Sequence, residues 1–216
     1  MKKTFILIAL IVGQAAVGLL NAQELSPLVK ATYDACLELQ AAIGSGSTAG
    51  LRSANASLKS CNTRDFNSIR FTDDDVPSLD GHFVFDYEFV DSLIVNRDVY
   101  RFAQRYAERI GSRSVSSASD AVFTKTCAVR AKASTKFTFV SRGLQELAFV
   151  AEPGGTITVR IHDTTHDVWY NDTRSVKKGE PSRSMVINLP TDKRSTLEVE
   201  VINTSKDDIS FVVISN

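Results

Sequence analysis

Two histidines and two aspartates alternate in the second half of the chain. His162 and His166 are four residues apart, and Asp163 and Asp167 follow them directly. On a helix this spacing would place both imidazoles on one face, where they could bind zinc. Here the spacing straddles the end of a predicted strand and a turn. We therefore expect exposed loop histidines, with no metal site and no cofactor.

An aromatic pair with polar neighbours follows this cluster. The residues are Trp169, Tyr170, Asn171, Asp172 and Arg174. Aromatic rings beside polar groups are a common means of holding sugar rings in sandwich domains. Because residues alternate across a strand, one of the two aromatic residues should face the core and the other should face solvent. These five residues are the candidate ligand-binding site, and a tryptophan buried in the core is the simpler alternative.

A second polar set lies between the two halves of the chain. His82, Asp86 and Glu88 could serve a small hydrolase, since paired carboxylates perform acid–base work at defined separations. The sequence does not supply those separations. The cysteines lie on predicted packing faces, whereas a nucleophile needs an exposed, activated thiolate. We therefore assign no catalytic residue.

The chain has three cysteines, Cys36, Cys61 and Cys127. An odd number allows at most one intramolecular bridge in an exported protein. Cys36 and Cys61 fall on the apolar faces of two neighbouring predicted helices, so they are the candidate disulfide, with two buried thiols as the alternative. Cys127 is in register with core residues of a strand, which predicts a buried free thiol.

The first 22 residues have the layout of a secretory signal peptide. Lys2 and Lys3 precede an apolar run from Phe5 to Leu20, and Ala22 is a small residue at a plausible cleavage site. A retained membrane anchor is the alternative, although the run is short for a membrane span of about 20 residues. We expect a protein that is secreted, or held in the periplasm or at the cell surface, with no membrane span once the signal is removed.

The charge balance argues against one class of partner. The chain carries 25 Lys and Arg residues against 25 Asp and Glu residues, so its formal net charge is zero. Proteins that bind nucleic acid usually have a strong basic surplus. We therefore predict no nucleic-acid partner.

Residues 23–113 are predicted to form a mainly helical N-terminal region. Apolar residues recur at three- and four-residue steps over 25–43, and a Gly-Ser-Gly turn at 44–46 separates this helix from a second one. The two helices should pack as a hairpin. A further helix is predicted for 96–110, whereas 82–94 fit a strand and a helix equally well.

The pattern changes to a period of two after a serine-rich stretch at 114–119, which we interpret as a linker. About eight short alternating segments over 120–216 are separated by glycine, proline and aspartate turns, which indicates an antiparallel β-sandwich. The predicted fold is therefore α+β, with a helical region followed by a sandwich of jelly-roll or related type.

The sandwich region also resembles a known family. The run from Glu146 to Asp163 resembles the early strands of bacterial pre-peptidase C-terminal domains, which are small sandwiches appended to secreted proteins. The similarity continues in 168–172, 197–203 and 209–213. The acidic Asp-x-Asp-Leu strand and the Gly-x-Tyr of that family are absent, so calcium or collagen binding is not carried over. The whole chain also resembles small secreted proteins of gut Bacteroidetes, which implies a compartment and no activity.

Together these patterns predict a non-catalytic binding or interaction module outside the cytoplasm. Its partner would be a glycan or another extracytoplasmic protein. The alternative is the small extracytoplasmic hydrolase that uses the acidic and histidine residues between the two halves.

Overall fold

The computed structural model describes four stretches of the chain, residues 24–72, 77–95, 121–170 and 179–216. The predicted signal peptide at 1–22, the helix predicted for 96–110 and the serine-rich linker at 114–119 lie outside the described residues.

Three helices make up the first part of the structure, α1 (Pro27–Gly44), α2 (Thr48–Ser60) and α3 (Tyr87–Val95). The first two form the predicted hairpin. Pro27 lies in the first turn of α1, where its missing N–H costs no hydrogen bond. Ser47 caps α2, because its Oγ accepts a hydrogen bond of 3.0 Å from the backbone N–H of Gly50. None of the described helices is long and apolar enough to cross a membrane.

The ambiguous stretch 82–94 divides at one aspartate. Residues before Tyr87 are not helical, and α3 starts there. Asp86 Oδ1 accepts hydrogen bonds from the backbone N–H groups of Glu88 (2.8 Å) and Phe89 (3.2 Å), so it caps the helix. Phe83 and Phe85 therefore lie in a buried, non-helical segment, and the helical spacing of Phe89 and Leu93 belongs to α3.

Ten strands form two five-stranded sheets. Sheet A has the order β1-β3-β10-β5-β8 and sheet B has the order β2-β4-β9-β6-β7. Eight of these strands follow residue 120, which confirms the predicted number. All the pairings are antiparallel except that of β1 with β3, which is parallel. The strands are β1 (Thr63–Asp65), β2 (Arg70–Phe71), β3 (Val122–Val129), β4 (Ser134–Ser141), β5 (Leu144–Ala151), β6 (Ile157–Asp163), β7 (Val168–Trp169), β8 (Ser182–Asn188), β9 (Ser195–Asn203) and β10 (Ile209–Ser215).

The sandwich takes two short strands, β1 and β2, from the region before residue 120. β1 adds to the edge of sheet A and β2 adds to the edge of sheet B. Between these two strands, Phe66 and Ile69 are buried in the core that fills the space between the sheets. The ring of Phe66 meets that of Phe139 edge-on, with centroids 5.3 Å apart. The chain therefore joins the sandwich well before the serine-rich stretch.

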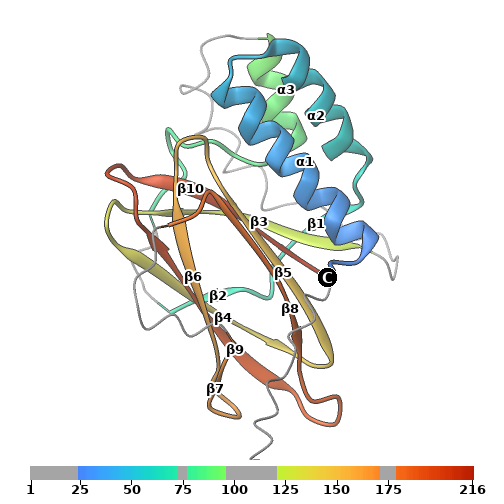
Figure 1. The fold of residues 1–216 in the computed structure, drawn as a ribbon, viewed down its shortest axis with the longest axis vertical. Helices are drawn as coiled ribbons and strands as arrows, with labels where there is room; N and C mark the ends of the chain where they lie inside the picture. Colours follow the sequence, from blue (N-terminus) through green and yellow to red (C-terminus); the bar gives the residue numbers. More distant parts are fainter. Residues whose placement is uncertain (1–23, 73–76, 96–120, 171–178) are drawn as a thin grey trace, which may run out of the picture.

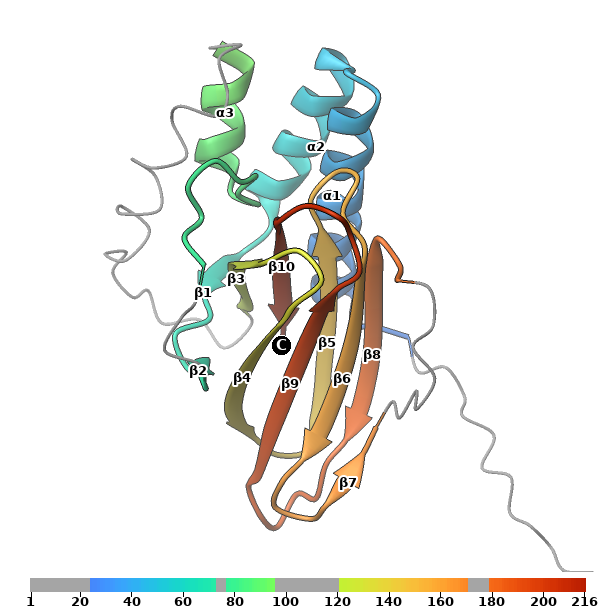
Figure 2. The same ribbon diagram turned by 90° about the vertical axis from the view of Figure 1, so that its left-hand side faces the viewer.

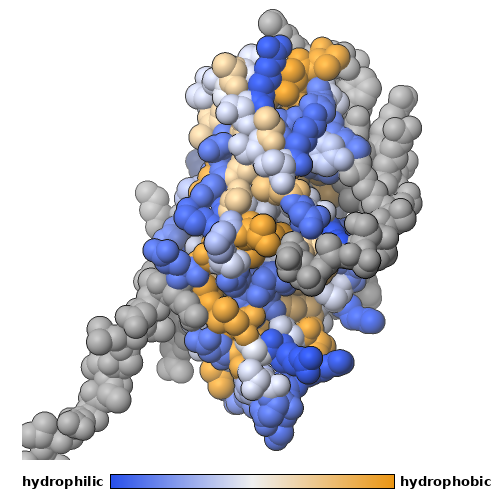
Figure 3. All heavy atoms as spheres, turned by 90° about the vertical axis from the view of Figure 1, so that its right-hand side faces the viewer, coloured by the Kyte–Doolittle hydropathy of each residue, from blue (hydrophilic) through white to orange (hydrophobic). Residues whose placement is uncertain are grey.

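The helices cover only one side of this sandwich. Figure 1 shows the described helices packed together beside the strands of sheet A. A second apolar core joins the helices to the outer face of this sheet, including Ala148, Val150, Val212 and Ile214. In the space-filling view toward α1 and β8, apolar side chains are interspersed with polar ones (Figure 3). The strands β4, β9 and β6 of sheet B lie in front in Figure 2, and no described helix covers them. The structure is an α+β fold with a β-sandwich, as predicted, and among the described residues the helices lie on sheet A alone.

Candidate functional site

The His/Asp cluster lies on the hairpin between β6 and β7, at one edge of sheet B. In this short hairpin His162 is the cross-strand partner of Trp169, and Asp163 is the partner of Val168. Asp167 has a φ of 56°, in the left-handed region that aspartate tolerates better than most residues. The turn therefore brings the cluster and the aromatic pair together.

A buried carboxylate holds the hairpin turn in place. Asp163 has no exposed surface, and its Oδ1 accepts hydrogen bonds from the backbone N–H groups of Thr165 (2.9 Å) and His166 (3.3 Å). Its Oδ2 lies 2.8 Å from His166 Nδ1. Burial by itself would raise the pKa of Asp163. The hydrogen bonds from His166, Ser195 and the two backbone groups outweigh burial and lower this pKa below its ordinary value.

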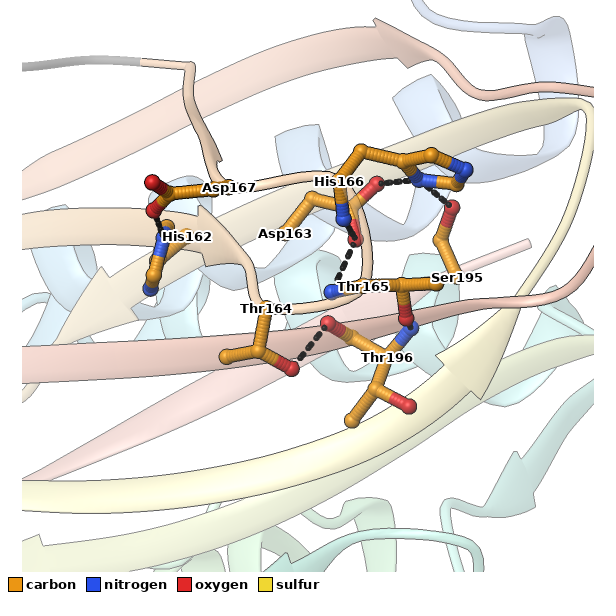
Figure 4. Close-up of polar contacts among 8 residues, drawn as sticks. All are labelled: His162, Asp163, Thr164, Thr165, His166, Asp167, Ser195 and Thr196. Atoms are coloured by element: carbon orange, nitrogen blue, oxygen red, sulfur yellow. Dashed lines mark hydrogen bonds and ion pairs between the residues drawn. The ribbon is translucent and has the colours of Figure 1, made fainter.

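Asp163, His166 and Ser195 bring together the residue types of a hydrolytic triad, but not its geometry (Figure 4). In a triad the carboxylate and the serine bind opposite nitrogens of the imidazole. Here Ser195 Oγ lies 3.2 Å from Nδ1, the nitrogen that also meets Asp163, while Nε2 points away from both. An ionised carboxylate only accepts hydrogen bonds, so Nδ1 carries the proton and cannot take one from serine. Ser195 is also fully buried, so this trio stabilises the turn.

An exposed aromatic platform stands beside this turn. The indole of Trp169 stacks on the imidazole of His162, with centroids 4.4 Å apart and an interplanar angle of 7°. His162 Nε2 in turn hydrogen-bonds Asp167 Oδ1 at 2.9 Å. Trp169 is 46% exposed, and it is the only exposed aromatic residue in the described part of the chain. One indole face is covered by His162, which leaves the other for a ligand.

The structure divides the five predicted binding residues into three groups. Trp169 points to solvent, so the alternative of a core tryptophan is wrong. Tyr170 is half-buried and packs against the inter-sheet core, and burial followed by the nearby charge of Asp163 raises its pKa. The expected division between an inward and an outward aromatic residue is therefore confirmed. Asn171, Asp172 and Arg174 lie outside the described residues.

The two histidines do not converge on a common point. His162 belongs to the aromatic platform and His166 belongs to the turn held by Asp163. Within the described stretches, no group of three or more His, Cys, Asp or Glu side chains is placed to hold a metal ion.

The residues of the alternative hydrolase have structural contacts instead. His82 Nδ1 lies 3.5 Å from Glu152 Oε2, an oxygen that also accepts from the backbone of Phe83 and from Ser210 Oγ. Asp86 caps α3, as described above. Glu88 accepts a hydrogen bond of 3.3 Å from the hydroxyl of its neighbour Tyr87. Nothing in this arrangement pairs two carboxylates across a cleft.

A small pocket with a volume of about 180 Å³ lies beside the C-terminal end of β4. Its walls include Phe66, Phe123 and Gln145, and no titratable side chain lines it. The Gln145 amide is already engaged by Ser141 and Ser215. The pocket therefore lacks the groups that acid–base chemistry requires.

All three cysteines are free thiols in the structure. Cys36 is buried in α1, and burial, together with a smaller effect of nearby Cys61, raises its pKa. Cys127 is buried as predicted, and burial raises its pKa to about 12. Cys61 is only half-buried and its Sγ lies 3.3 Å from the carbonyl of Ser57. Cys61 is near enough to affect the pKa of Cys36, and a bridge between the two stays a prediction.

Sequence reasoning missed Ser195 and the brace between His162 and Asp167. Ser195 is 29 residues from His166 along the chain and reaches it because β9 pairs with β6. The one available signal was the alternation of β9, which places Ser195 on the same side as Leu197.

Comparison with known protein families and with curated proteins finds no match for this chain. Three solved structures are similar to 44% of it. The plu4264 protein of Photorhabdus luminescens is 30% identical over 61% of its own chain, with a TM-score of 0.22. The enzymatically active domain of tailspike protein 4 of bacteriophage CBA120 is 18% identical over 17% of its chain, with a TM-score of 0.25. TmCBM61 in complex with beta-1,4-galactotriose is 14% identical over 87% of its chain, with a TM-score of 0.22. The chain spans less than two thirds of the first two proteins. Similarities at these TM-scores establish neither a shared fold nor a shared function.

Proposed function

We propose that this protein is a non-catalytic binding module that works outside the cytoplasm and binds a glycan on the indole face of Trp169. The observation that carries the proposal is the exposed Trp169 ring, held flat against His162 at the edge of sheet B. Sugar rings present apolar C–H faces, and an aromatic face beside polar groups suits them. The resemblance of the sandwich to domains appended to secreted proteins agrees with an accessory role.

A binding role also fits the chemistry of the polar residues. The Asp163 trio holds a turn, and the acidic residues near α3 cap a helix or pair locally. A hydrolase needs a pocket that brings titratable groups to one substrate. The pocket beside β4 has no titratable side chain in its lining, so we favour binding over hydrolysis.

The test is a glycan array probed with residues 23–216 and with three variants. We expect Trp169→Ala to lose binding at least tenfold, because the platform disappears. Val168→Ala is the matched control, since Val168 is exposed on the same short strand but does not stack on His162. Tyr170→Phe keeps the core contact and should bind like the wild type. The proposal is wrong if the wild type binds no glycan, or if Trp169→Ala binds as well as the wild type does.

A further inference from the structure

One line of residues crosses every strand of sheet B. Each residue of the line is the cross-strand partner of the next. From β2 through β4, β9 and β6 to β7, the residues are Arg70, Thr138, Glu198, His162 and Trp169. Their neighbours along the longer strands are buried in the inter-sheet core, so this line faces outward. It is the only outward line that includes both short edge strands, and Trp169 stands at one end of it.

Glu198 is the unusual residue of this line. Its carboxylate is half-buried between Thr138 and His162, and it has no hydrogen-bond or ion-pair partner in the described residues. Glu200, two residues further along the same face, is engaged by Arg160 at 3.3 Å and by Lys136 at 3.9 Å. The same strand therefore carries one satisfied carboxylate and one that is free to accept hydrogen bonds.

The charge next to the aromatic platform disfavours an anionic ligand there. Arg160 and Lys136 are already occupied by Glu200, whereas Glu198 and Asp167 lie near the aromatic platform. A sulfate or uronate beside Trp169 would meet like charge. A sugar hydroxyl would instead donate to Glu198, in a charge-assisted hydrogen bond.

The length of the line indicates the size of the ligand. Strands are about 4.8 Å apart, so four strand spacings make the line roughly 19 Å long. A sugar unit in an extended glycan advances by about one strand spacing. A chain of about four units would thus reach from Trp169 to Arg70.

We propose that sheet B binds a linear, neutral glycan laid across its strands, with one unit on Trp169, hydroxyls donated to Glu198 at the centre and the far end at Arg70. This inference rests on the proposed glycan-binding function. It adds that the ligand is neutral, that it lies across the strands, and that Glu198 accepts hydrogen bonds from its hydroxyl groups.

The experiment uses calorimetry with full-length mature protein and three neutral series, gluco-, galacto- and manno-oligosaccharides, each from monosaccharide to hexasaccharide. Oligogalacturonates of the same lengths serve as anionic probes. We expect affinity for a neutral series to rise with length and level off near the tetrasaccharide. Glu198→Gln should weaken binding about tenfold. Arg70→Ala should remove only the gain of the longest ligands, and the matched Glu200→Gln should change affinity by less than about twofold because surface ion pairs contribute little.

The outcomes separate the two proposals. The inference is overturned if Trp169→Ala abolishes binding while Glu198→Gln binds like the wild type. It is also overturned if affinity does not depend on length, or if oligogalacturonates bind more tightly than the neutral ligands. Binding of none of the three neutral series by the wild type would also overturn the inference. Absence of binding to every glycan on the array, or unchanged binding by Trp169→Ala, would refute the glycan-binding function itself. Circular dichroism of each variant checks that the fold is kept.

Discussion

The indole of Trp169 lies almost parallel to the imidazole of His162, 4.4 Å away between ring centroids and on the neighbouring strand. Asp167 contacts His162 from the turn, 2.9 Å from its Nε2. A free tryptophan on an edge strand would have to give up rotamer freedom when it binds a ligand. Because the ring here is already held, that entropy has been lost on folding, and the platform is preorganised.

The chain has a single tryptophan, so its intrinsic fluorescence reports on Trp169 alone. We expect emission typical of an exposed indole and efficient quenching by acrylamide. A bound neutral oligosaccharide should shift the emission to shorter wavelength and reduce quenching. His162→Ala removes the brace, so we expect about threefold to tenfold weaker binding with the indole still exposed. Emission typical of a buried indole in the free protein would contradict the exposed platform.

Replacing the buried carboxylate should loosen the hairpin. Asp163→Asn keeps the size of the side chain but removes the charge that the surrounding donors stabilise. We expect the free energy of unfolding to fall by about 1–3 kcal/mol, as measured by urea denaturation. The matched control is Asp167→Asn, whose side chain is 92% exposed, and its unfolding curve should stay near that of the wild type. Equal stability of the two variants would argue against a structural role for Asp163.

The contribution of Asp163 should also depend on pH in a defined direction. The pKa of this carboxyl is lower in the folded chain than its ordinary value of 3.8. Its stabilisation is therefore fully present above that value and is lost as pH falls through the lower folded pKa. The stability difference between wild type and Asp163→Asn should be constant from pH 7 to pH 5 and should shrink toward pH 2. A difference that persists unchanged at pH 2 would contradict the lowered pKa.

Ser195 should be chemically inert despite its neighbours. It is buried, and it meets the protonated nitrogen of His166 instead of a free base. We expect no labelling by a fluorophosphonate probe, and no difference between wild type and Ser195→Ala in hydrolysis of a simple ester. Labelling that disappears in Ser195→Ala would show that the site rearranges into a working nucleophile.

The sequence predicted the long elements because each carries its own periodic signal. β4, β6 and β9 alternate over seven residues or more, and α1 repeats its apolar positions over several turns. β5 and β10 are buried on both faces, and their length and flanking turns made them recognisable. β1 and β2 have three and two residues, too few for any period. The stretch 82–94 was ambiguous because Phe85 and Phe89 fit a period of two together with Phe83, and fit a helical spacing together with Leu93.

Less of the candidate site could be predicted. Trp169 and Tyr170 were identified from residue type, but which of them faces the core depends on how the hairpin pairs with β6. The Asp163 contact with Ser195 and the line through Glu198 both depend on cross-strand register. Register joins residues that are distant in the chain, so a local pattern does not contain it.

The cysteines allow a direct test of the predicted bridge. In the reduced, folded protein we expect Cys61 to react first with a thiol reagent, because Cys36 and Cys127 are buried and burial raises the pKa of both. Protein recovered from an oxidising compartment and denatured without reductant should show one free thiol, Cys127. Cys61→Ser should then show two. Three labelled thiols in the unmodified protein would mean that Cys36 and Cys61 are not bridged.

The last prediction concerns where the sandwich begins as a folding unit. A fragment of residues 120–216 would lack β1 and β2, and with them Phe66 and Ile69 from the inter-sheet core. It would also expose the outer face of sheet A, which the helices cover. An apolar sheet face in water is an association surface. We therefore expect this fragment to aggregate or to elute as large species in size-exclusion chromatography, whereas residues 23–216 should unfold cooperatively.

A matched variant distinguishes the two causes. Serine at Val150 and Val212 makes the outer face of sheet A polar without touching the inter-sheet core. If the uncovered face alone causes aggregation, this variant of the fragment should be soluble and folded by circular dichroism. If the loss of Phe66 and Ile69 matters as much, the variant should be soluble but unfolded, because the cavity they leave costs several kcal/mol. A wild-type fragment that is monomeric and unfolds cooperatively would instead show that the sandwich is independent of everything before residue 120.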